Sequence, residues 1–207
     1  MKKIISLKNI LYVYEKKTII NNITLDIENS KPVVLKGPNG AGKTTLLKIM
    51  SGLLRPTQGL VERNYAKTAS SSFIFQNPVF LNCSVYSNLE HALYCRNMPK
   101  ENRHNTIENI LQKYSLSYLA NKEIKILSGG ELQLVSLIRS LITDPLIIFY
   151  DEPTNNLDSY NIDLISDIIQ NCVVSNIQII MVSHNYDFIN KLDPLHINIK
   201  NGALINE

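Results

Sequence analysis

The segment GPNGAGKT, from Gly37 to Thr44, constrains the fold of this chain more than any other stretch. It fits the pattern G-x-x-x-x-G-K-[ST], in which glycines let the backbone wrap around a polyphosphate. It follows KPVVLKG (31–37), a β-branched run typical of a buried strand, and precedes helical periodicity over Thr44–Leu54. A strand, a phosphate loop and a helix in this order predict an α/β fold that binds a nucleotide. A plain glycine-rich turn is the alternative.

The residue types of this loop predict a division of roles. Three glycines leave the backbone bare where it must approach the phosphates, and the following helix N-terminus adds positive potential. We expect Lys43 to neutralise the β and γ phosphates, and the Thr44 hydroxyl to ligate Mg²⁺. The loop residues expected to hold the nucleotide are Gly37, Pro38, Asn39, Gly40, Ala41, Gly42, Lys43, Thr44 and Thr45.

Two carboxylates end a second apolar run, PLIIFYDE (145–152). Adjacent residues at a strand end point to opposite sides, so Asp151 can face a metal ion while Glu152 faces an attacking water. We expect Asp151 to ligate Mg²⁺ directly or through water, and Glu152 to act as general base or to position the water. A solvated acidic turn is the alternative, which a phosphate loop on another buried strand disfavours.

His184 and Gln76 also follow buried-strand patterns, IQIIMVSH (177–184) and SSFIF (71–75). His184 leaves the sheet at the same kind of position as Asp151, so it can reach the γ-phosphate, although a lone histidine is more often structural. The amide of Gln76 can touch both Mg²⁺ and the attacking water. The other histidines are expected at the surface: His91, His104 and His196.

The segment LSGGE begins an amphipathic helix but places two glycines in its first turn. Ser128 and Glu131 form an S-x-x-E capping box, whereas Gly129 and Gly130 are poor helix formers. Either the chain turns tightly here, or another molecule must approach the bare backbone closely. The segment alone does not decide between these explanations.

The order of expected elements fits one large domain. Strands alternate with helices, which implies a mainly parallel core sheet flanked by helices. We expect residues 1–79 and 144–207 to form this core with an N-terminal antiparallel β-subdomain, and about 80–143 to form an inserted helical subdomain. Strands are expected at Ile4–Leu7, Ile19–Ile27, Gly59–Arg63 and in a closing hairpin at Pro194–Ile199 and Ala203–Ile205. Helices are expected at Val85–Tyr94, Lys100–Tyr114, Leu116–Ala120 and from Asp158 or Ser159 to Cys172.

The composition limits the possible functions less than the motifs do. The 207 residues carry a formal net charge of +3 without a long basic run, so nucleic acid is not an expected partner. The three cysteines are scattered and form neither a metal-binding spacing nor a disulfide framework, which suits a reducing cytosol. No apolar run reaches the roughly 18 residues of a membrane span, and the first residues do not read as a signal peptide. A membrane role is therefore expected to come through a partner.

The motifs, in this order, resemble those of the ATP-binding cassette (ABC) ATPases: GPNGAGKT, Gln76 in FIFQNP, LSGGE, LIIFYDEPTNNLD and VSH. The resemblance covers almost the whole chain, and LSGGE is its most specific part, since other phosphate-loop classes lack it. It implies a P-loop NTPase that hydrolyses ATP with Mg²⁺, and two cassettes packed head to tail. In such a homodimer, Ser128, Gly129 and Gly130 of one chain close on the γ-phosphate held by the other, which would explain the two glycines.

The resemblance also implies roles for residues outside these loops. Tyr14 is expected to stack on adenine, with Tyr12 as the fallback and a plain strand residue as the alternative. Asp158 looks like the family's dimer-contact aspartate, and it is also a candidate helix N-cap. Two positions depart from the family pattern: Leu134 stands where a basic residue is usual, and Ile138 where a small one is common. These departures leave open how actively the isolated chain hydrolyses ATP.

The first hypothesis from the resemblance is the ATPase subunit of a membrane transporter. It would lie on the cytoplasmic face of the membrane, held by an integral membrane permease subunit, with a solute-binding protein as a further candidate partner. The permease groove should lie between Gln76 and the helical subdomain. Its apolar floor, or alternatively the core of the helical subdomain, would use Val79, Phe80, Leu81, Tyr86 and Leu89.

Two other classes stay open. One is a cassette that signals across the membrane to cell-wall or division machinery, which the sequence does not separate from transport. The other is a non-transport ATPase acting on ribosomes or DNA, which usually carries two cassettes or long insertions. FQNPVFLNCSVYSNLEHAL (75–93) looks like importers of tungstate- or molybdate-type oxyanions, although small export cassettes for haem or peptides are not separated from them.

Overall fold

The computed structural model describes residues 3–28, 31–65, 71–154 and 157–205, and its main element is a six-stranded sheet. The strand order is β5-β6-β7-β3-β8-β9, with the first five parallel and the last antiparallel. The strands are β3 (Val33–Lys36), β5 (Ser71–Ile74), β6 (Ile147–Asp151), β7 (Gln178–Val182), β8 (Leu195–Lys200) and β9 (Ala203–Ile205). The expected α/β class with a mainly parallel sheet is confirmed.

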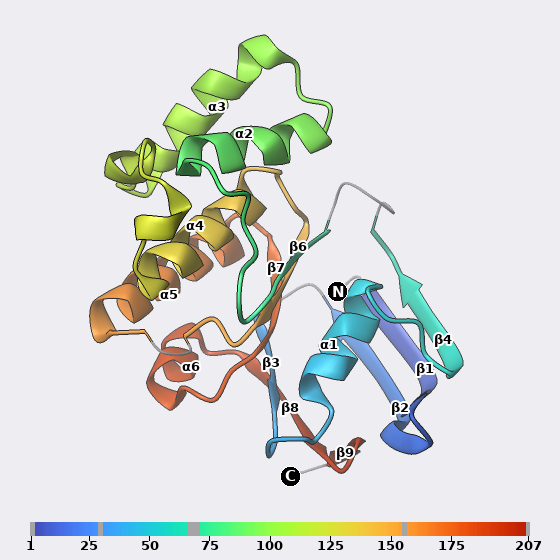
Figure 1. The fold of residues 1–207 in the computed structure, drawn as a ribbon. Coiled ribbons are helices and arrows are strands. Elements are labelled where there is room, and N and C mark those ends of the chain that lie inside the picture. Colours follow the sequence, from blue (N-terminus) through green and yellow to red (C-terminus); the bar gives the residue numbers. More distant parts are fainter. Residues whose placement is uncertain (1–2, 29–30, 66–70, 155–156, 206–207) are drawn as a thin grey trace.

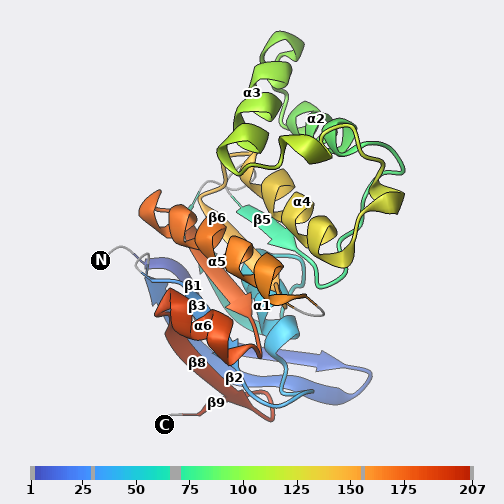
Figure 2. The ribbon, with the colours of Figure 1, turned by 90° about the vertical axis from the view of Figure 1, so that its left-hand side faces the viewer.

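Helices cover both faces of this sheet, so strands β6 and β7 are buried along their whole length (Figure 2). Alternate residues of β6 belong to different cores: Ile148 packs with α5 and α6, whereas Phe149 packs with α1. The helices concerned are α1 (Lys43–Ser51), α4 (Gly129–Leu141), α5 (Ser159–Val174) and α6 (Tyr186–Leu192). Because parallel strands end at one edge of the sheet, the residues that follow β3, β5, β6 and β7 meet there.

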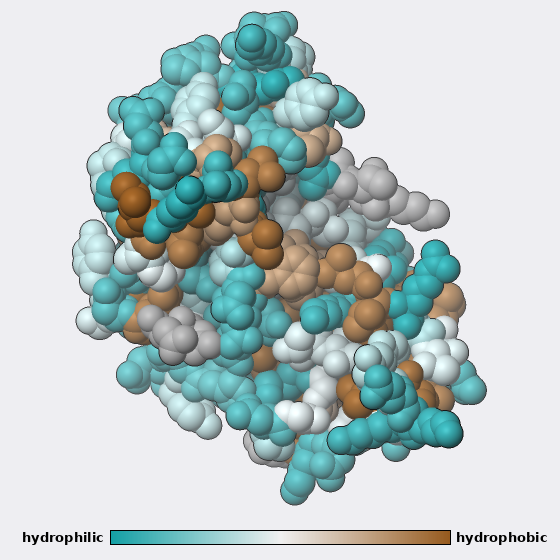
Figure 3. All heavy atoms as spheres, in the orientation of Figure 1, coloured by the Kyte–Doolittle hydropathy of each residue, from teal (hydrophilic) through white to brown (hydrophobic). Residues whose placement is uncertain are grey.

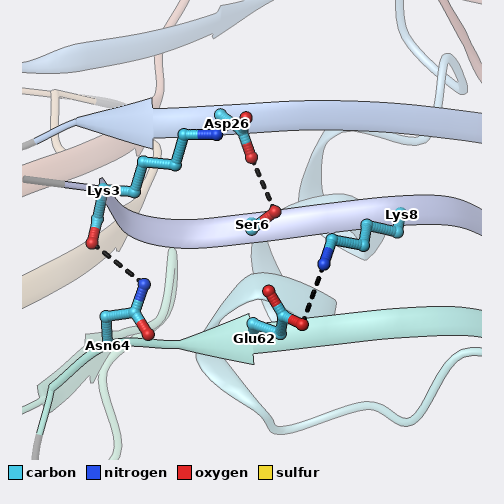
Figure 4. Close-up of polar contacts among 6 residues, drawn as sticks. All are labelled: Lys3, Ser6, Lys8, Asp26, Glu62 and Asn64. Atoms are coloured by element: carbon cyan, nitrogen blue, oxygen red, sulfur yellow. Dashed lines mark hydrogen bonds and ion pairs between the residues drawn. The ribbon is translucent and has the colours of Figure 1, made fainter.

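A second, three-stranded antiparallel sheet forms the expected β-subdomain, with the order β2-β1-β4. Its strands are β1 (Lys3–Tyr14), β2 (Lys17–Glu28) and β4 (Gln58–Arg63). Figure 4 shows polar side chains joining β1 to both neighbours: Ser6 donates to Asp26 at 2.6 Å, and Lys8 pairs with Glu62 at 2.9 Å. These cross-strand contacts help to set the register of the sheet.

The chain between β5 and β6 is helical, as expected. It contains α2 (Val85–Cys95), α3 (Lys100–Lys113), two 3₁₀ turns, η1 (Ser117–Leu119) and η2 (Ile124–Ile126), and then α4. In Figure 1, α2 and α3 form one end of the molecule, away from the three-stranded sheet. We call α2, α3, the two turns and α4 the helical lobe; its proposed limits at about 80 and 143 stay a prediction.

Two element boundaries differ from the sequence prediction. Helix α1 ends at Ser51 rather than Leu54, because Gly52 adopts a left-handed conformation (φ 90°) and caps it. Strand β1 continues to Tyr14 rather than ending at Leu7. Asn9 has a positive φ of 50° at an irregularity in the β1–β2 pairing, which breaks the apolar alternation.

Helix α6 was not predicted at all. It has only seven residues, and the side chain of Asn185 caps it by accepting a hydrogen bond from the Phe188 N–H. A helix of about two turns gives too few positions for helical periodicity to stand out. Its residues Phe188 and Ile189 are buried against the sheet, so the helix closes one side of the core.

Candidate functional site

A cavity of about 430 Å³ lies at the edge of the sheet where the parallel strands end. The phosphate loop, the end of β6 and the residues after β5 and β7 all contribute to it, as the strand-end argument predicts. Its lining residues are Lys17, Ile19, Asn39, Gly40, Gly42, Lys43, Thr44, Thr45, Gln76, Glu152, Val182 and His184. The fold therefore brings together predicted residues that are more than 140 positions apart in the sequence.

The phosphate loop requires glycine at specific positions for reasons visible in the structure. Gly37 has a φ of 145°, and a Cβ there would lie 2.0 Å from the Ile199 carbonyl oxygen on β8. Gly42 has a φ of 99° and precedes the first residue of α1. The β8–β9 hairpin also holds the loop, because the Gly202 N–H donates to the Ala41 carbonyl at 3.1 Å.

Lys43 lies inside the loop with only 7% of its surface exposed. Its ammonium donates to the carbonyl oxygens of Gly37 and Pro38, each at 2.9 Å. Burial lowers the pKa of this ammonium, and the nearby carboxylates of Glu152 and Asp151 oppose that shift. A cation held among loop carbonyls and carboxylates is placed to bind an incoming polyphosphate.

Thr44 and Asp151 form the pair that fits a magnesium ion. The Thr44 hydroxyl donates to Asp151 Oδ1 at 2.8 Å, and Asp151 is 5% exposed. Burial raises the pKa of the Asp151 carboxyl, while the bond from Thr44 opposes this. Among the described residues, no three or more acidic, histidine or cysteine side chains are placed so that they could hold a metal ion by themselves. Mg²⁺ at a nucleotide typically takes one or two carboxylates together with phosphates and water, so hydroxyl, carboxylate and the nearby Gln76 amide suit it.

Glu152 and His184 are neighbours in the lining of the cavity, with Oε1 and Nε2 3.4 Å apart. Glu152 has a positive φ of 52°, an uncommon conformation for a non-glycine residue, and its N–H donates to the Val182 carbonyl on β7 at 2.9 Å. Burial, and then the charge of Asp151, raise the pKa of Glu152. Burial, and then the charge of Lys43, lower the pKa of His184. A neutral imidazole beside a basic carboxylate suits the positioning and deprotonation of a water.

The capping box at the start of α4 is confirmed. Ser128 Oγ accepts from the Glu131 N–H at 3.2 Å, and a Glu131 carboxylate oxygen accepts from the Ser128 N–H at 2.8 Å. Neither Gly129 nor Gly130 has a positive φ, so no tight turn requires them. A Cβ on Gly129 would meet nothing within 4 Å, whereas one on Gly130 would lie 2.3 Å from Asn161 Nδ2. Glycine therefore stands at the two positions for different reasons. At 130 it makes room for the Asn161 side chain, and at 129 it leaves the backbone accessible to another molecule.

Asp158 caps α5, as its alternative role predicted. Its Oδ1 accepts from both the N–H and the side-chain amide of Asn161, at 2.8 and 2.9 Å. Asn161 thus lies between the start of α5 and the start of α4. Nothing in the sequence marks this asparagine, because it belongs to no motif and its contact with Gly130 spans 31 residues.

Some predicted site residues lie outside the cavity. Tyr14 ends β1 with 57% of its surface exposed, and Tyr12 packs partly against the core that contains α1. Within one chain, the lining of the cavity contains none of the following predicted residues: Tyr14, Gly37, Pro38, Ala41, Ser128, Gly129, Gly130, Asp151 and Asp158. Lys17 and Ile19 of β2 do line it, and the sequence analysis missed them because β-strand residues of this kind carry no motif.

The two departures on α4 are explained by packing. Leu134 and Ile138 are 1% and 0% exposed and belong to the core shared by the helical lobe, α5 and α6. Apolar side chains of this size fill positions that face the interior, so the helix needs no charged group there.

Residues 20–155 match the family model described as "ABC transporter". The zinc import ATP-binding protein ZnuC of Wigglesworthia glossinidia brevipalpis is 35% identical over 186 residues, covering 89% of this chain and 78% of its own length. The lipoprotein-releasing system ATP-binding protein LolD of the same organism is 32% identical over 216 residues, covering 95% of this chain and 94% of its own. These similarities extend across both the phosphate loop and the helical lobe.

The solved structures give the same fold. The cassette MJ0796, in a dimeric post-hydrolysis state bound to ADP and Pi, superposes with a TM-score of 0.87 at 26% identity, covering 98% of this chain and 97% of the other. Among the described helices, none is long and apolar enough to cross a membrane.

Proposed function

The chain belongs to the ABC transporter family as an ATP-hydrolysing cassette, and we propose that closure of two such chains around ATP drives solute transport through a membrane subunit. The observation that carries this proposal is the cavity at the sheet edge. The phosphate loop, Thr44, Glu152 and His184 line it, and Asp151 is hydrogen-bonded to the lining residue Thr44.

The residues of the cavity divide the reaction among them. The loop backbone and Lys43 bind the phosphates, while Thr44, Asp151 and Gln76 would hold the ion. Mg²⁺, when bound, neutralises charge on the phosphate oxygens. Glu152 accepts a proton from the attacking water, or aligns it, because burial and Asp151 make its carboxylate more basic than usual. His184, kept neutral by its lowered pKa, donates its ring N–H toward the γ-phosphate.

The site of one chain is incomplete in this proposal, and a second copy completes it. Ser128 and Gly129 are exposed and lie outside the cavity lining. Their backbone N–H groups start helix α4, where the positive end of the helix dipole can bind a phosphate held by the partner chain. Asp158 caps α5 beside this segment through Asn161, so it would lie at the same contact. The dimeric MJ0796 structure supports this arrangement by similarity.

The membrane subunit is proposed to dock beside the chain between β5 and α2. Figure 3 shows apolar residues across the middle of the face where this segment runs. Val79 and Leu81 are 77% and 48% exposed there, whereas Phe80 and Tyr86 are partly buried and Leu89 is fully buried. Of the five residues predicted to form the apolar floor of the permease groove, only Val79 and Leu81 are therefore proposed to contact the membrane subunit. Phe80, Tyr86 and Leu89 belong to the core of the helical lobe. Docking here would place the chain on the inner face of the membrane.

In this proposal the membrane subunit, not the cassette, selects the transported solute. Related cassettes are named for zinc import, lipoprotein release and spermidine or putrescine import. Such a spread shows that cassettes of this similarity serve different solutes. The oxyanion import suggested by residues 75–93 stays a prediction. A cassette of a transmembrane signalling complex is the second candidate, because it would use the same ATP site and the same docking surface.

The experiment that tests the proposal is a mild-detergent pull-down of the tagged chain from its native membranes, with mass spectrometry of the co-purified proteins. A variant with both Val79 and Leu81 changed to Asp is the matched control, because both side chains are exposed and the fold should persist. We expect a polytopic membrane protein at equal stoichiometry with the wild type and its loss with the variant. Ribosomal or DNA-repair proteins in its place would contradict the transport role.

A further inference from the structure

A buried glutamine links three elements that surround the candidate site. Gln133 lies on α4 with 5% of its surface exposed. Its Nε2 donates to the backbone carbonyl of Gln76, 2.8 Å away and 57 residues earlier in the chain. Its Oε1 accepts from the hydroxyl of Tyr150 on β6, 3.1 Å away. One amide thus joins the helix of the LSGGE segment, the second residue after β5 and the strand that ends at Asp151.

The arrangement fixes the direction of this amide. If it were rotated by 180°, Oε1 would face the Gln76 carbonyl, and two acceptors would meet without a proton between them. The Tyr150 hydroxyl is fully buried, and burial raises its pKa, so it remains a neutral donor. Each of the two hydrogen bonds therefore holds the amide in the orientation that the other one requires, as in a fully satisfied buried network.

Both ends of this link lie beside groups assigned to the reaction. Gln76 lines the cavity with Glu152 and Lys43, and its carbonyl is the atom that Gln133 holds. Tyr150 immediately precedes Asp151, whose carboxylate accepts from Thr44. Gln133 itself lies three residues after Gly130, less than one helical turn away. A shift of α4 would consequently move the anchor of Gln76 along with the LSGGE segment.

We propose that Gln133, held in orientation by Tyr150, is a positioning residue that fixes Gln76 in the cavity and couples it to the start of α4. The proposal rests on the assignment of Gln76 to the ATP site. In this role Gln133 does not contact the nucleotide. It determines where the Gln76 side chain can reach, because the backbone carbonyl of that residue is tied to α4 rather than left free at the end of β5.

The first test is hydrogen–deuterium exchange on the full chain without nucleotide, so it does not depend on turnover. Gln133→Met keeps the length and buried volume of the side chain but removes both hydrogen bonds. We expect faster exchange at Gln76–Phe80 and unchanged exchange at β7. The matched control is Gln170→Met, which removes a glutamine-to-carbonyl bond of 3.0 Å to Lys191 on the far side of the fold. Unchanged exchange at Gln76–Phe80 in Gln133→Met would overturn the proposal.

The second test is a double-mutant cycle in ATP turnover. We expect Gln133→Met to lower kcat by about tenfold while changing KM for ATP by less than about twofold, because positioning acts on the reaction rather than on uniform binding. In a Gln76→Ala background the same substitution should change kcat by less than about twofold. An equal loss in both backgrounds would mean that Gln133 acts independently of Gln76, and would overturn the proposal. If Gln76→Ala alone left turnover intact, the assignment of Gln76 would fail instead.

Tyr150→Phe separates the two halves of the link. It deletes the hydroxyl that orients the amide but leaves Gln133 able to donate to the Gln76 carbonyl. We expect an exchange rate at Gln76–Phe80 between those of the wild type and Gln133→Met. Exchange as fast as in Gln133→Met would still support the relay, whereas exchange identical to the wild type would remove Tyr150 from it.

Discussion

Substituting the two glycines of LSGGE one at a time should give opposite effects on stability. Alanine at 130 would place a Cβ 2.3 Å from Asn161 Nδ2 and 2.5 Å from its Cγ. Asn161 must then rotate away and lose its 2.9 Å bond to Asp158, which contributes about 0.5–1.5 kcal/mol. Overpacking adds about 1–3 kcal/mol, and the better helix propensity of alanine returns up to about 1 kcal/mol. We expect a net loss of about 0.5–4.5 kcal/mol of unfolding free energy.

Alanine at 129 meets no atom within 4 Å. Its only local effects are the improved helix propensity and a less flexible unfolded chain, so stability should rise by up to about 1 kcal/mol. For a chain of this size, 1 kcal/mol corresponds to about 2–4 °C in Tm. Gly129→Ala should therefore raise Tm slightly, while Gly130→Ala should lower it by several degrees.

Thermal unfolding of the nucleotide-free chain, followed by circular dichroism, measures both shifts. The control is a double-mutant cycle with Asn161→Ala, because that substitution removes the side chain that a Cβ at position 130 would meet. In that background Gly130→Ala should behave like Gly129→Ala. Equal shifts for the two glycines, or a Gly130→Ala loss that persists in the Asn161→Ala background, would refute the explanation based on Asn161.

Three further outcomes are expected. Lys43→Ala should abolish ATP hydrolysis in a phosphate-release assay, whereas Lys31→Ala, which removes an exposed ion pair with Asp193, should leave it unchanged; wild-type turnover of the first variant would remove the phosphate-loop assignment. Turnover should fall with decreasing pH at a point above 4.5, the ordinary glutamate value, because the pKa of Glu152 is raised and its charged form is the base; a pH–rate profile that stayed flat down to 4.5 would contradict this. Asp158→Ala should lower the stability of the chain by about 1 kcal/mol through loss of the α5 cap, and Asp158→Asn should retain it; equal Tm values for the two variants would exclude the cap as the cause.

Several residues that line the cavity were predictable because the signal for each is local in the sequence. The phosphate loop, Asp151, Glu152 and His184 lie at or just after the ends of recognisable strands, and strand ends of a parallel sheet share one edge. Glycine at 37 was expected from phosphate binding. In the fold, the atom that most directly excludes a side chain there is the Ile199 carbonyl oxygen on the neighbouring strand. That constraint is invisible in the sequence, since it depends on the order of strands in the sheet.

The contacts that connect these groups were not predictable. Gln133 meets Gln76 across 57 residues, and Asn161 meets Gly130 across 31, so neither pair has a periodic or motif signal. Helix α6 is too short for its pattern to be distinguished from a loop. The adenine-stacking role of Tyr14 was inferred from the family resemblance and not from a local sequence pattern. The structure places Tyr14 at an exposed strand end outside the cavity, and its role stays a prediction.

The central claim is that two chains share each ATP site, and light scattering of Glu152→Gln tests it most directly. This variant removes the base but keeps the cavity, so it should bind ATP without hydrolysing it. With saturating MgATP we expect twice the 23.5 kDa mass of one chain, and adding Gly129→Ala should return the mass to that of one chain. A mass of one chain for Glu152→Gln, at ATP concentrations where binding is measured to be complete, would contradict the shared-site account.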